Sequence, residues 1–487
     1  MRHIIPATLL ATALSAAAQY QPSGYLDTAF GRNPRNMAAR HTSSLQAAMH
    51  ADEQQPTRHP GLNSPGEVIR HSRTRDEKQS RNGWIWFPST PQNFAPYLDS
   101  VFVPGNTCIQ PCDIISHDPL STAAQQVKTR LSRIGLQYNL VMSANYTGIA
   151  PHSRGGRNDF ASTNNSLTGM WYLLKKADNS QGLFLSFEAD WGHGFRFNEN
   201  KSSAQNTIGS LSNPQGSYRG GNEVYIPNLA LGYSAFKGKW VGMIGTIDTS
   251  DFLDQNIYSA DWNGNLMNEA FNLNPCLPLE EANWAYLTAW QPSENFYAMY
   301  ATSGCNGKVN HNPFHSISSN AWVHLTEFGF IHDDVAGMGK GTYRLQYTFT
   351  RYKGESGFGA AVNIQQQLGR NSPLGFFSRC GWMDNDAATV SNVRAAATAG
   401  LVLQAPFRSS GWGSNANNDQ IALGFLWERA AVAPYRHKDE YGLELSAVVQ
   451  VTPTFFIQPD IQYIFNPVYQ KDRDGEFIFQ IQGVLRF

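Results

Sequence analysis

The chain has 487 residues, and its 37 basic and 38 acidic side chains leave a formal net charge of −1. Because the chain has no excess of positive charge, its charge gives no reason to expect a nucleic-acid partner. Charged residues make up only 15% of the chain and aromatic residues 12%, yet the mean hydropathy is −0.39. These values exclude a helical membrane protein. They are compatible with a membrane β-barrel, because a barrel strand presents only every second residue to lipid.

The chain begins with the three regions of a secretory signal peptide. Arg2 is followed by an apolar run over residues 4–14 and then by alanines at 16–18. A membrane-spanning helix is the weaker interpretation, because it needs ~20 apolar residues. We therefore expect residues 1–18 to be cleaved, with Gln19 as the new amino terminus and export of the mature chain.

Two segments with different compositions follow the expected signal peptide. Residues 31–82 carry nine basic and five acidic side chains, a local charge of +4, and few apolar residues. We expect the extension 19–82 to be disordered, either as a solvated linker or as a tail for an anionic surface. Residues 83–133 contain several aromatic side chains and a predicted helix at 119–133. We expect this segment to pack on or in the main domain.

Sixteen strand-like runs of about ten residues fill residues 134–487. Ten-residue strands suit a tilted membrane crossing, whereas strands of soluble β-sandwiches are shorter. Connections are mostly short on one side, and on the other side they include the long segments 192–223 and 249–282. This asymmetry is typical of outer-membrane barrels. The predicted runs are 134–146, 164–174, 182–191, 224–236, 239–248, 283–291, 294–302, 320–331, 340–351, 357–368, 374–383, 393–404, 418–429, 438–450, 455–466 and 476–487.

Apolar and polar residues alternate along many of these runs. In the last run, Phe477, Phe479 and Ile481 share one face, whereas Gln480 and Gln482 share the other. The sequence therefore predicts an all-β fold: a transmembrane antiparallel β-barrel, over residues 134–487, with a short helix and a disordered extension before it. The terminal Phe487 is a feature of outer-membrane barrels, and we expect the last strand to contact the barrel-assembly machinery.

The polar faces are the candidate functional surface, because the sequence contains no Gly-x-Ser-x-Gly, no His-Glu-x-x-His and no Walker-type loop. We expect no enzyme activity, no cofactor and no metal. Mixed charges and amides facing a lumen suit a neutral polyol or a zwitterion better than a simple ion filter. The alternative interpretation of each residue is a network that stiffens the wall without touching solute. The candidate channel-lining and substrate-contact residues are Arg379, Arg344, Glu188, Asp190, Glu444, Asp460, Gln458 and Gln462.

The five cysteines are Cys108, Cys112, Cys276, Cys305 and Cys380. An exported chain permits disulfides, and both Cys108 with Cys112 and Cys276 with Cys305 are open as pairs. A zinc site at the first pair is less favoured, because no second pair of ligands lies nearby.

Four stretches of the sequence form a set with a shared order and spacing: Arg130–Tyr138, Lys239–Asp248, Gly375–Arg379 with its inward arginine, and Gln458–Pro467 before the terminal strand. With this set, the sequence over residues 119–487 resembles the carbohydrate-selective porins of the OprB family. The resemblance implies a sixteen-stranded porin in the outer-membrane lipid that passes small sugars by passive diffusion. Uptake of arginine, known for some members, is an alternative. An outer-membrane barrel hydrolase is the alternative from another class. It would need clustered histidines and aspartates on the loops, and the sequence shows no such pair.

Overall fold

In the computed structural model, residues 83–89, 91–103, 115, 118–150, 158–195, 204–215, 224–261, 263–279, 283–305, 317, 319–370, 372–404, 406, 419–471 and 473–487 are described. The predicted signal peptide and extension, residues 1–82, lie outside them. Within the described residues, no helix has the length and apolar character needed to cross a membrane.

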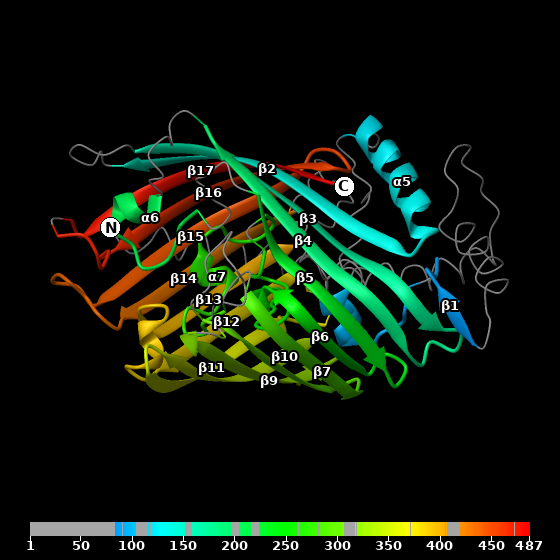
Figure 1. The fold of residues 1–487 in the computed structure, drawn as a ribbon. Helices are drawn as coiled ribbons and strands as arrows, with labels where there is room; N and C mark the ends of the chain where they lie inside the picture. Colours follow the sequence, from blue (N-terminus) through cyan, green and yellow to red (C-terminus); the bar gives the residue numbers. More distant parts are fainter. Residues whose placement is uncertain are drawn as a thin grey trace.

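Sixteen antiparallel strands, β2 to β17, close into one barrel (Figure 1), which confirms the predicted fold. Each strand pairs with its neighbours in the sequence, and β17 pairs with β2 to close the ring. A short additional strand, β1 (Trp84–Trp86), pairs with the end of β3. The barrel strands are β2 Leu136–Ala150, β3 Asp159–Lys176, β4 Gly182–Gly194, β5 Val224–Ala235, β6 Trp240–Ile247, β7 Asn283–Ser293, β8 Phe296–Gly304, β9 Trp322–His332, β10 Gly341–Tyr352, β11 Glu355–Gln367, β12 Leu374–Met383, β13 Val393–Gln404, β14 Gln420–Ala430, β15 Asp439–Gln450, β16 Phe455–Phe465 and β17 Gly475–Arg486.

The side chains alternate across the barrel wall as the sequence predicts. In β17, the outward Phe477, Phe479 and Ile481 are 43%, 48% and 51% exposed, whereas the inward Gln480 and Gln482 are 4% and 0% exposed. Closure leaves no unpaired sheet edge, so every strand backbone can be hydrogen-bonded without water. An apolar band can therefore face lipid while the polar residues face the interior.

The two ends of the barrel differ in the length of their connections. One end, which we call the turn end, carries 177–181, 236–239, 294–295 and 451–454, together with the carboxyl terminus. The opposite end, the loop end, carries the long connections 195–223 and 248–282. Each end has an exception: the fifteen-residue segment between β13 and β14 lies at the turn end, and the tight 353–354 turn lies at the loop end.

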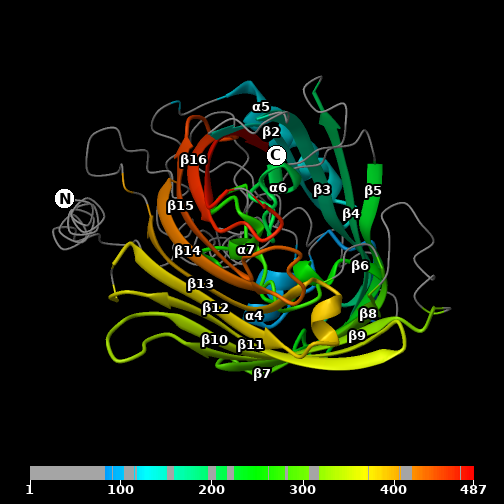
Figure 2. The ribbon, with the colours of Figure 1, turned by 90° about the vertical axis from the view of Figure 1, so that its left-hand side faces the viewer.

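Three pieces of chain lie inside the ring of strands (Figure 2). The first is the helix α4 (Pro96–Phe102), which precedes the barrel in sequence. The second, the inner loop 248–279, contains η3 (Thr249–Asp251) and α7 (Glu269–Asn272). The third is 204–215, which begins with α6 (Ala204–Ile208). These pieces divide the lumen, so the barrel alone does not define the path through it.

The helix α5 (Pro119–Ser132) lies outside the ring, near the start of β2 (Figure 1), and matches the helix predicted over 119–133. Asp118 caps its amino terminus by accepting a hydrogen bond from the Ser121 amide at 2.6 Å. The other Asp118 carboxylate oxygen accepts a bond from the Thr454 hydroxyl at 2.9 Å, in the turn between β15 and β16. The cap therefore ties α5 to the turn end. A short 3₁₀ helix, η4 (Ala387–Thr389), follows β12 at the loop end.

Candidate functional site in the barrel lumen

An arginine on β12 fastens the inner loop to the wall. The Arg379 Nε atom lies 2.8 Å from Asp254 Oδ2, and both side chains are fully buried. The Nη1 atom donates to the Phe271 carbonyl at 2.5 Å and to the Ser259 hydroxyl, while Nη2 donates to the Asp254 carbonyl at 2.9 Å. One guanidinium thus bonds to the first part of the inner loop, at Asp254 and Ser259, and to its later part, at Phe271. Its charge is balanced by a carboxylate of that loop.

A second buried charge pair lies beside it on β9 and β10. Glu327 accepts hydrogen bonds at 2.8 Å from the Asp254 amide, the Gln346 side chain and the Tyr297 hydroxyl. Arg344 Nε donates to the Tyr297 hydroxyl at 2.9 Å and lies 3.9 Å from the Glu327 carboxylate. These contacts hold the loop against the wall at the Asp254 position.

The opposite side of the inner loop rests on β15 and β16. Glu444 accepts hydrogen bonds from the Met267 and Asn268 amides, the latter at 3.0 Å. Gln458 Nε2 donates to the Asn265 carbonyl at 2.8 Å. Backbone groups of the loop are therefore satisfied by side chains of the wall, as buried backbone requires.

The segment 204–215 is held by neighbouring polar side chains of the same wall. Gln462 Nε2 donates to the Pro214 carbonyl at 2.9 Å and to Asp460 Oδ1 at the same distance. Nearer the loop end, Ser210 donates to Glu440 and Ser212 donates to Glu428. Serine donors and backbone amides neutralise much of the cost of burying these carboxylates.

The open space lies on the remaining side, between the inner loop and strands β2, β3 and β4. This wide cleft holds about 810 Å³ of empty space, including the part that is open to solvent. Its lining is polar, with four carboxylates and several amides and hydroxyls, and it includes no lysine or arginine. The lining residues are Asn139, Val141, Asn164, Ser166, Thr168, Glu188, Asp190, Ser250, Asp251, Gln255, Ala260, Asp261, Asn263, Asn272 and Leu273. Of the carboxylates, Asp261 is balanced by Arg486, whose Nη2 lies 2.8 Å away.

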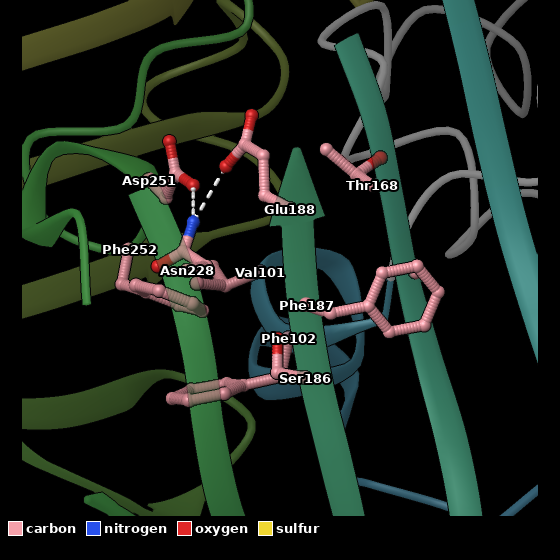
Figure 3. Close-up of a pocket in the computed structure, with 10 residues that line it drawn as sticks. Val101, Phe102, Thr168, Ser186, Phe187, Glu188, Asn228, Asp251 and Phe252 are labelled. Atoms are coloured by element: carbon pink, nitrogen blue, oxygen red, sulfur yellow. Dashed lines mark hydrogen bonds between the residues drawn. The ribbon is translucent and has the colours of Figure 1, made fainter. Parts of the chain in front are cut away.

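A narrow cleft of about 320 Å³ continues from the wide one and shares Thr168, Glu188 and Asp251 with it (Figure 3). Asn228 on β5 donates through Nδ2 to Glu188 at 2.5 Å and to Asp251, so one amide bridges the wall and the inner loop. The register between β4 and β5 shifts beside Glu188. Such irregularities re-aim side chains next to functional sites.

The predicted site residues thus fall into two groups. Glu188 and Asp190 line the wide cleft, together with polar residues of β2, β3 and the inner loop. The other six are buried and line neither cleft. Four of them bond to the inner loop or to the segment 204–215, whereas Arg344 and Asp460 bond to neighbouring side chains of the wall. They are Arg379, Arg344, Glu444, Asp460, Gln458 and Gln462.

Several cleft residues were not predicted as functional. Asn164, Ser166 and Thr168 alternate along β3, and this period of two in polar residues was a usable signal. Asp251 and Asp261 gave no such signal, because they lie in an irregular loop whose inward fold depends on tertiary contacts.

Of the two cysteine pairs considered above, Cys276 with Cys305 lies within the described residues. No disulfide links Cys276 to Cys305, and Cys108 and Cys112 lie outside the described residues. Burial raises the pKa of the Cys276 thiol, which keeps it protonated. In the described part of the chain, no group of three His, Cys, Asp or Glu side chains is placed to hold a metal ion.

Comparison with known proteins finds one family model and several solved barrels that resemble the chain. Residues 316–487 match the model of the family "Carbohydrate-selective porin, OprB family". The high-pH structure of Pseudomonas putida OprB superposes with a TM-score of 0.57 at 15% identity, covering 78% of this chain and 99% of that one. A mutant of the Rh. blastica porin gives a TM-score of 0.46 at 9% identity, covering 72% of this chain and 100% of that one. No curated protein sequence matches the chain.

Proposed function

We propose that this chain is a carbohydrate-selective porin of the OprB family, whose model residues 316–487 match, and that it passes small sugars by passive diffusion across an outer membrane. It is a porin and not an enzyme. The observation that carries the choice of solute is the wide cleft, whose carboxylate, amide and hydroxyl groups match the many hydroxyls of a sugar. Donors and acceptors along a wet path favour weak, exchangeable binding, which speeds passage without trapping the solute.

The residues proposed to contact the passing sugar are Glu188, Asp190, Asn164, Ser166 and Asp251. The first four project from β3 and β4, and Asp251 projects from the inner loop. Arg379, Glu444, Gln458 and Gln462 act indirectly, because they bond to the inner loop and so fix the width of the cleft. Arg344 and Asp460 support the wall side chains beside them. Passage is downhill and needs no cofactor.

The remaining parts of the chain complete the proposal. Residues 1–18 serve as a signal peptide removed during export, and β17, ending before Phe487, is the element contacted by the barrel-assembly machinery. In outer-membrane barrels the short turns face the periplasm. The turn end, with α5 and the carboxyl terminus, is therefore the periplasmic end.

A second candidate solute is a cationic amino acid such as arginine. It is favoured by one observation: the wide cleft is lined by four carboxylates and by no basic side chain. An acidic path concentrates cations by its field.

Liposome swelling tests both candidates. The purified protein is reconstituted and exposed to glucose, maltose, arginine and a neutral amino acid at equal osmolarity. Faster swelling with glucose than with either amino acid supports the sugar porin. Faster swelling with arginine supports the second candidate, and equal rates for all four solutes contradict solute preference of either kind.

A further inference from the structure

Part of the inner wall is apolar, where a wet lumen would require polar residues. The inward side chains of β6 to β9 include Val241, Met243, Leu287, Tyr297 and Leu325, all at most 2% exposed. Outward residues of the same strands face lipid, so this part of the wall is apolar on both faces. A wall of this kind must be covered by other protein, because exposing it to a water-filled lumen would be costly.

The covering piece is the segment 91–103, which we call the plug segment; it contains α4. Leu98 is fully buried and Phe102 is 3% exposed, both in the same apolar cluster as the wall residues. The Tyr97 ring stacks on Tyr297 with ring centroids 3.7 Å apart. Phe94 meets Phe184 edge-on at 5.8 Å. The plug segment is thus packed like a protein core and not merely threaded through the barrel.

Hydrogen bonds fix the plug segment at the turn end. The Ala95 amide donates to the Gly238 carbonyl at 3.0 Å, in the turn between β5 and β6. Gln291 Oε1 accepts from the Tyr97 amide at 2.9 Å and so satisfies a donor in the first turn of α4. Gln92 Nε2 donates to the Asn179 carbonyl at 2.6 Å, in the turn between β3 and β4.

The inward positions of β4 show how far the open path extends. Asp190 and Glu188 line the wide cleft, and Ser186, one step nearer the turn end, lines the narrow cleft. The next inward residue, Phe184, is covered by Phe94. At Gly182, a Cβ atom would lie 2.6 Å from Gln92 Oε1. The open space along this strand therefore narrows toward the plug segment.

Two side chains of α4 face this narrowing. Val101 and Phe102 line the narrow cleft opposite Glu188 and Asn228, as Figure 3 shows, and the Phe102 ring lies 5.2 Å from that of Phe252 on the inner loop. We propose that the plug segment is a built-in size filter in which Val101 and Phe102 set the largest solute that leaves the channel at the turn end. This proposal rests on the proposed porin function and adds the residues that determine its size selectivity.

The physical basis is a change of chemistry along the path. A sugar in the wide cleft exchanges hydrogen bonds with water for bonds with carboxylates and amides. Val101 and Phe102 are each only 3% exposed, and the small surface they leave on the narrow cleft is apolar and offers no hydrogen bond. A larger sugar would therefore have to lose more of its hydration there. Small solutes pass with their water, and larger ones are held back.

The test compares full-length variants in liposome swelling with a monosaccharide, a disaccharide and a trisaccharide. The double variant Val101→Ala/Phe102→Ala shortens the two filter side chains. The variant Leu98→Asp places a charge in the buried face of α4 and so expels the plug segment. Phe236→Ala is the matched control, because Phe236 lies on a turn and its side chain is 74% exposed. Resistance of the folded barrel to unfolding in cold detergent shows that each variant is assembled.

We expect both filter variants to raise the disaccharide and trisaccharide rates severalfold relative to the monosaccharide rate, with Phe236→Ala at the wild-type ratio. Unchanged ratios in both folded variants, alongside a conducting wild type, overturn the size filter and leave the porin function intact. If the wild type and every folded variant fail to swell with any sugar, the porin function is contradicted and the filter with it.

Discussion

The inner wall of this barrel holds the pieces of chain inside it in two different ways. Along β6 to β9 most inward residues are apolar and are covered by the plug segment through ring stacking and close contact. In the middle of β15 and β16 the inward residues are polar, and they hold the inner loop through hydrogen bonds from Gln458 and to Glu444. The difference teaches that an inward polar residue can serve to hold another piece of chain, as Arg379, Glu444, Gln458 and Gln462 do.

The largest expected effect concerns the charged fastening of the inner loop. Arg379→Ala leaves Asp254 buried without its cation, and removing one partner of such a pair costs about 3–5 kcal/mol. We expect the docked loop to loosen, with a larger or noisier single-channel conductance in a barrel that still assembles. Arg370→Ala is the control, because Arg370 forms an exposed pair with Asp334 on a turn. If the two variants conduct alike, Arg379 does not control the loop.

Substitutions that keep the side-chain volume should have different stability costs in the apolar wall of β6 to β9 and in the polar wall of β15 and β16. Leu287, fully buried in the apolar wall, should tolerate methionine at less than about 1.5 kcal/mol, whereas Leu287→Ala should cost about 2–5 kcal/mol. In the polar wall, Gln458→Leu keeps the volume but leaves the Asn265 carbonyl unpaired, a cost of about 1–3 kcal/mol. Denaturant unfolding measures all three. A Gln458→Leu variant as stable as Leu287→Met would show that the walls do not differ in this way.

Neutralising the cleft acids tests the electrostatics of the path without disturbing either packed wall. Glu188→Gln and Asp190→Asn keep the side-chain shapes and remove two of the four carboxylates that line the wide cleft. We expect a lower preference for cations, measured as a smaller reversal potential across a salt gradient. Glu444→Gln is the comparison, since Glu444 lies beneath the inner loop and should alter selectivity less. Equal loss of selectivity in both cases would place the ion path elsewhere.

The smallest effect is expected outside the barrel, at the cap of α5. Burial alone would raise the pKa of Asp118, but hydrogen bonds from Ser121 and Thr454 outweigh it and hold that pKa below its ordinary value. The cap therefore stabilises α5 above the ordinary carboxyl pKa and loses this contribution as the pH falls through the lowered pKa. Asp118→Ala should cost about 1 kcal/mol, seen as faster amide exchange in α5 near neutral pH. Asn is also a good cap, so a smaller loss in Asp118→Asn isolates the charge. Exchange in Asp118→Ala that matches the wild type across the pH range would remove this role.

The barrel itself followed from the sequence because its signal is repeated sixteen times. The alternation of apolar and polar residues along β16 or β17 is a weak signal in any one strand. The signal becomes strong because many strands of the closed barrel show the same alternation. The plug segment could not be predicted in the same way, because α4 has only seven residues and its apolar face is matched to distant strands. The inner loop raised the same difficulty: Asp254 and Arg379 are far apart in sequence, and only the closed barrel brings them together.

Strands β6 to β9 show where the alternation of apolar and polar residues fails to predict which side chains face inward. Met243 and Leu287 face inward, yet their sequence context is as apolar as that of lipid-facing positions. A pattern argument assumes a wet interior, and it fails where the chain fills the interior with its own residues.

Thiol modification in a planar bilayer tests the position of the path most directly. Both Ser166 on β3 and Ser446 on β15 point inward. Ser166 lines the wide cleft, whereas Ser446 is fully buried and is not part of its lining. Ser166→Cys and Ser446→Cys are treated with a charged, water-soluble thiol reagent, and the wild type is treated in parallel to account for the native cysteines. We predict a stepwise fall in conductance for Ser166→Cys alone. A conductance of Ser166→Cys that the reagent leaves unchanged, with a fall in Ser446→Cys, would contradict the path between the inner loop and strands β2 to β4.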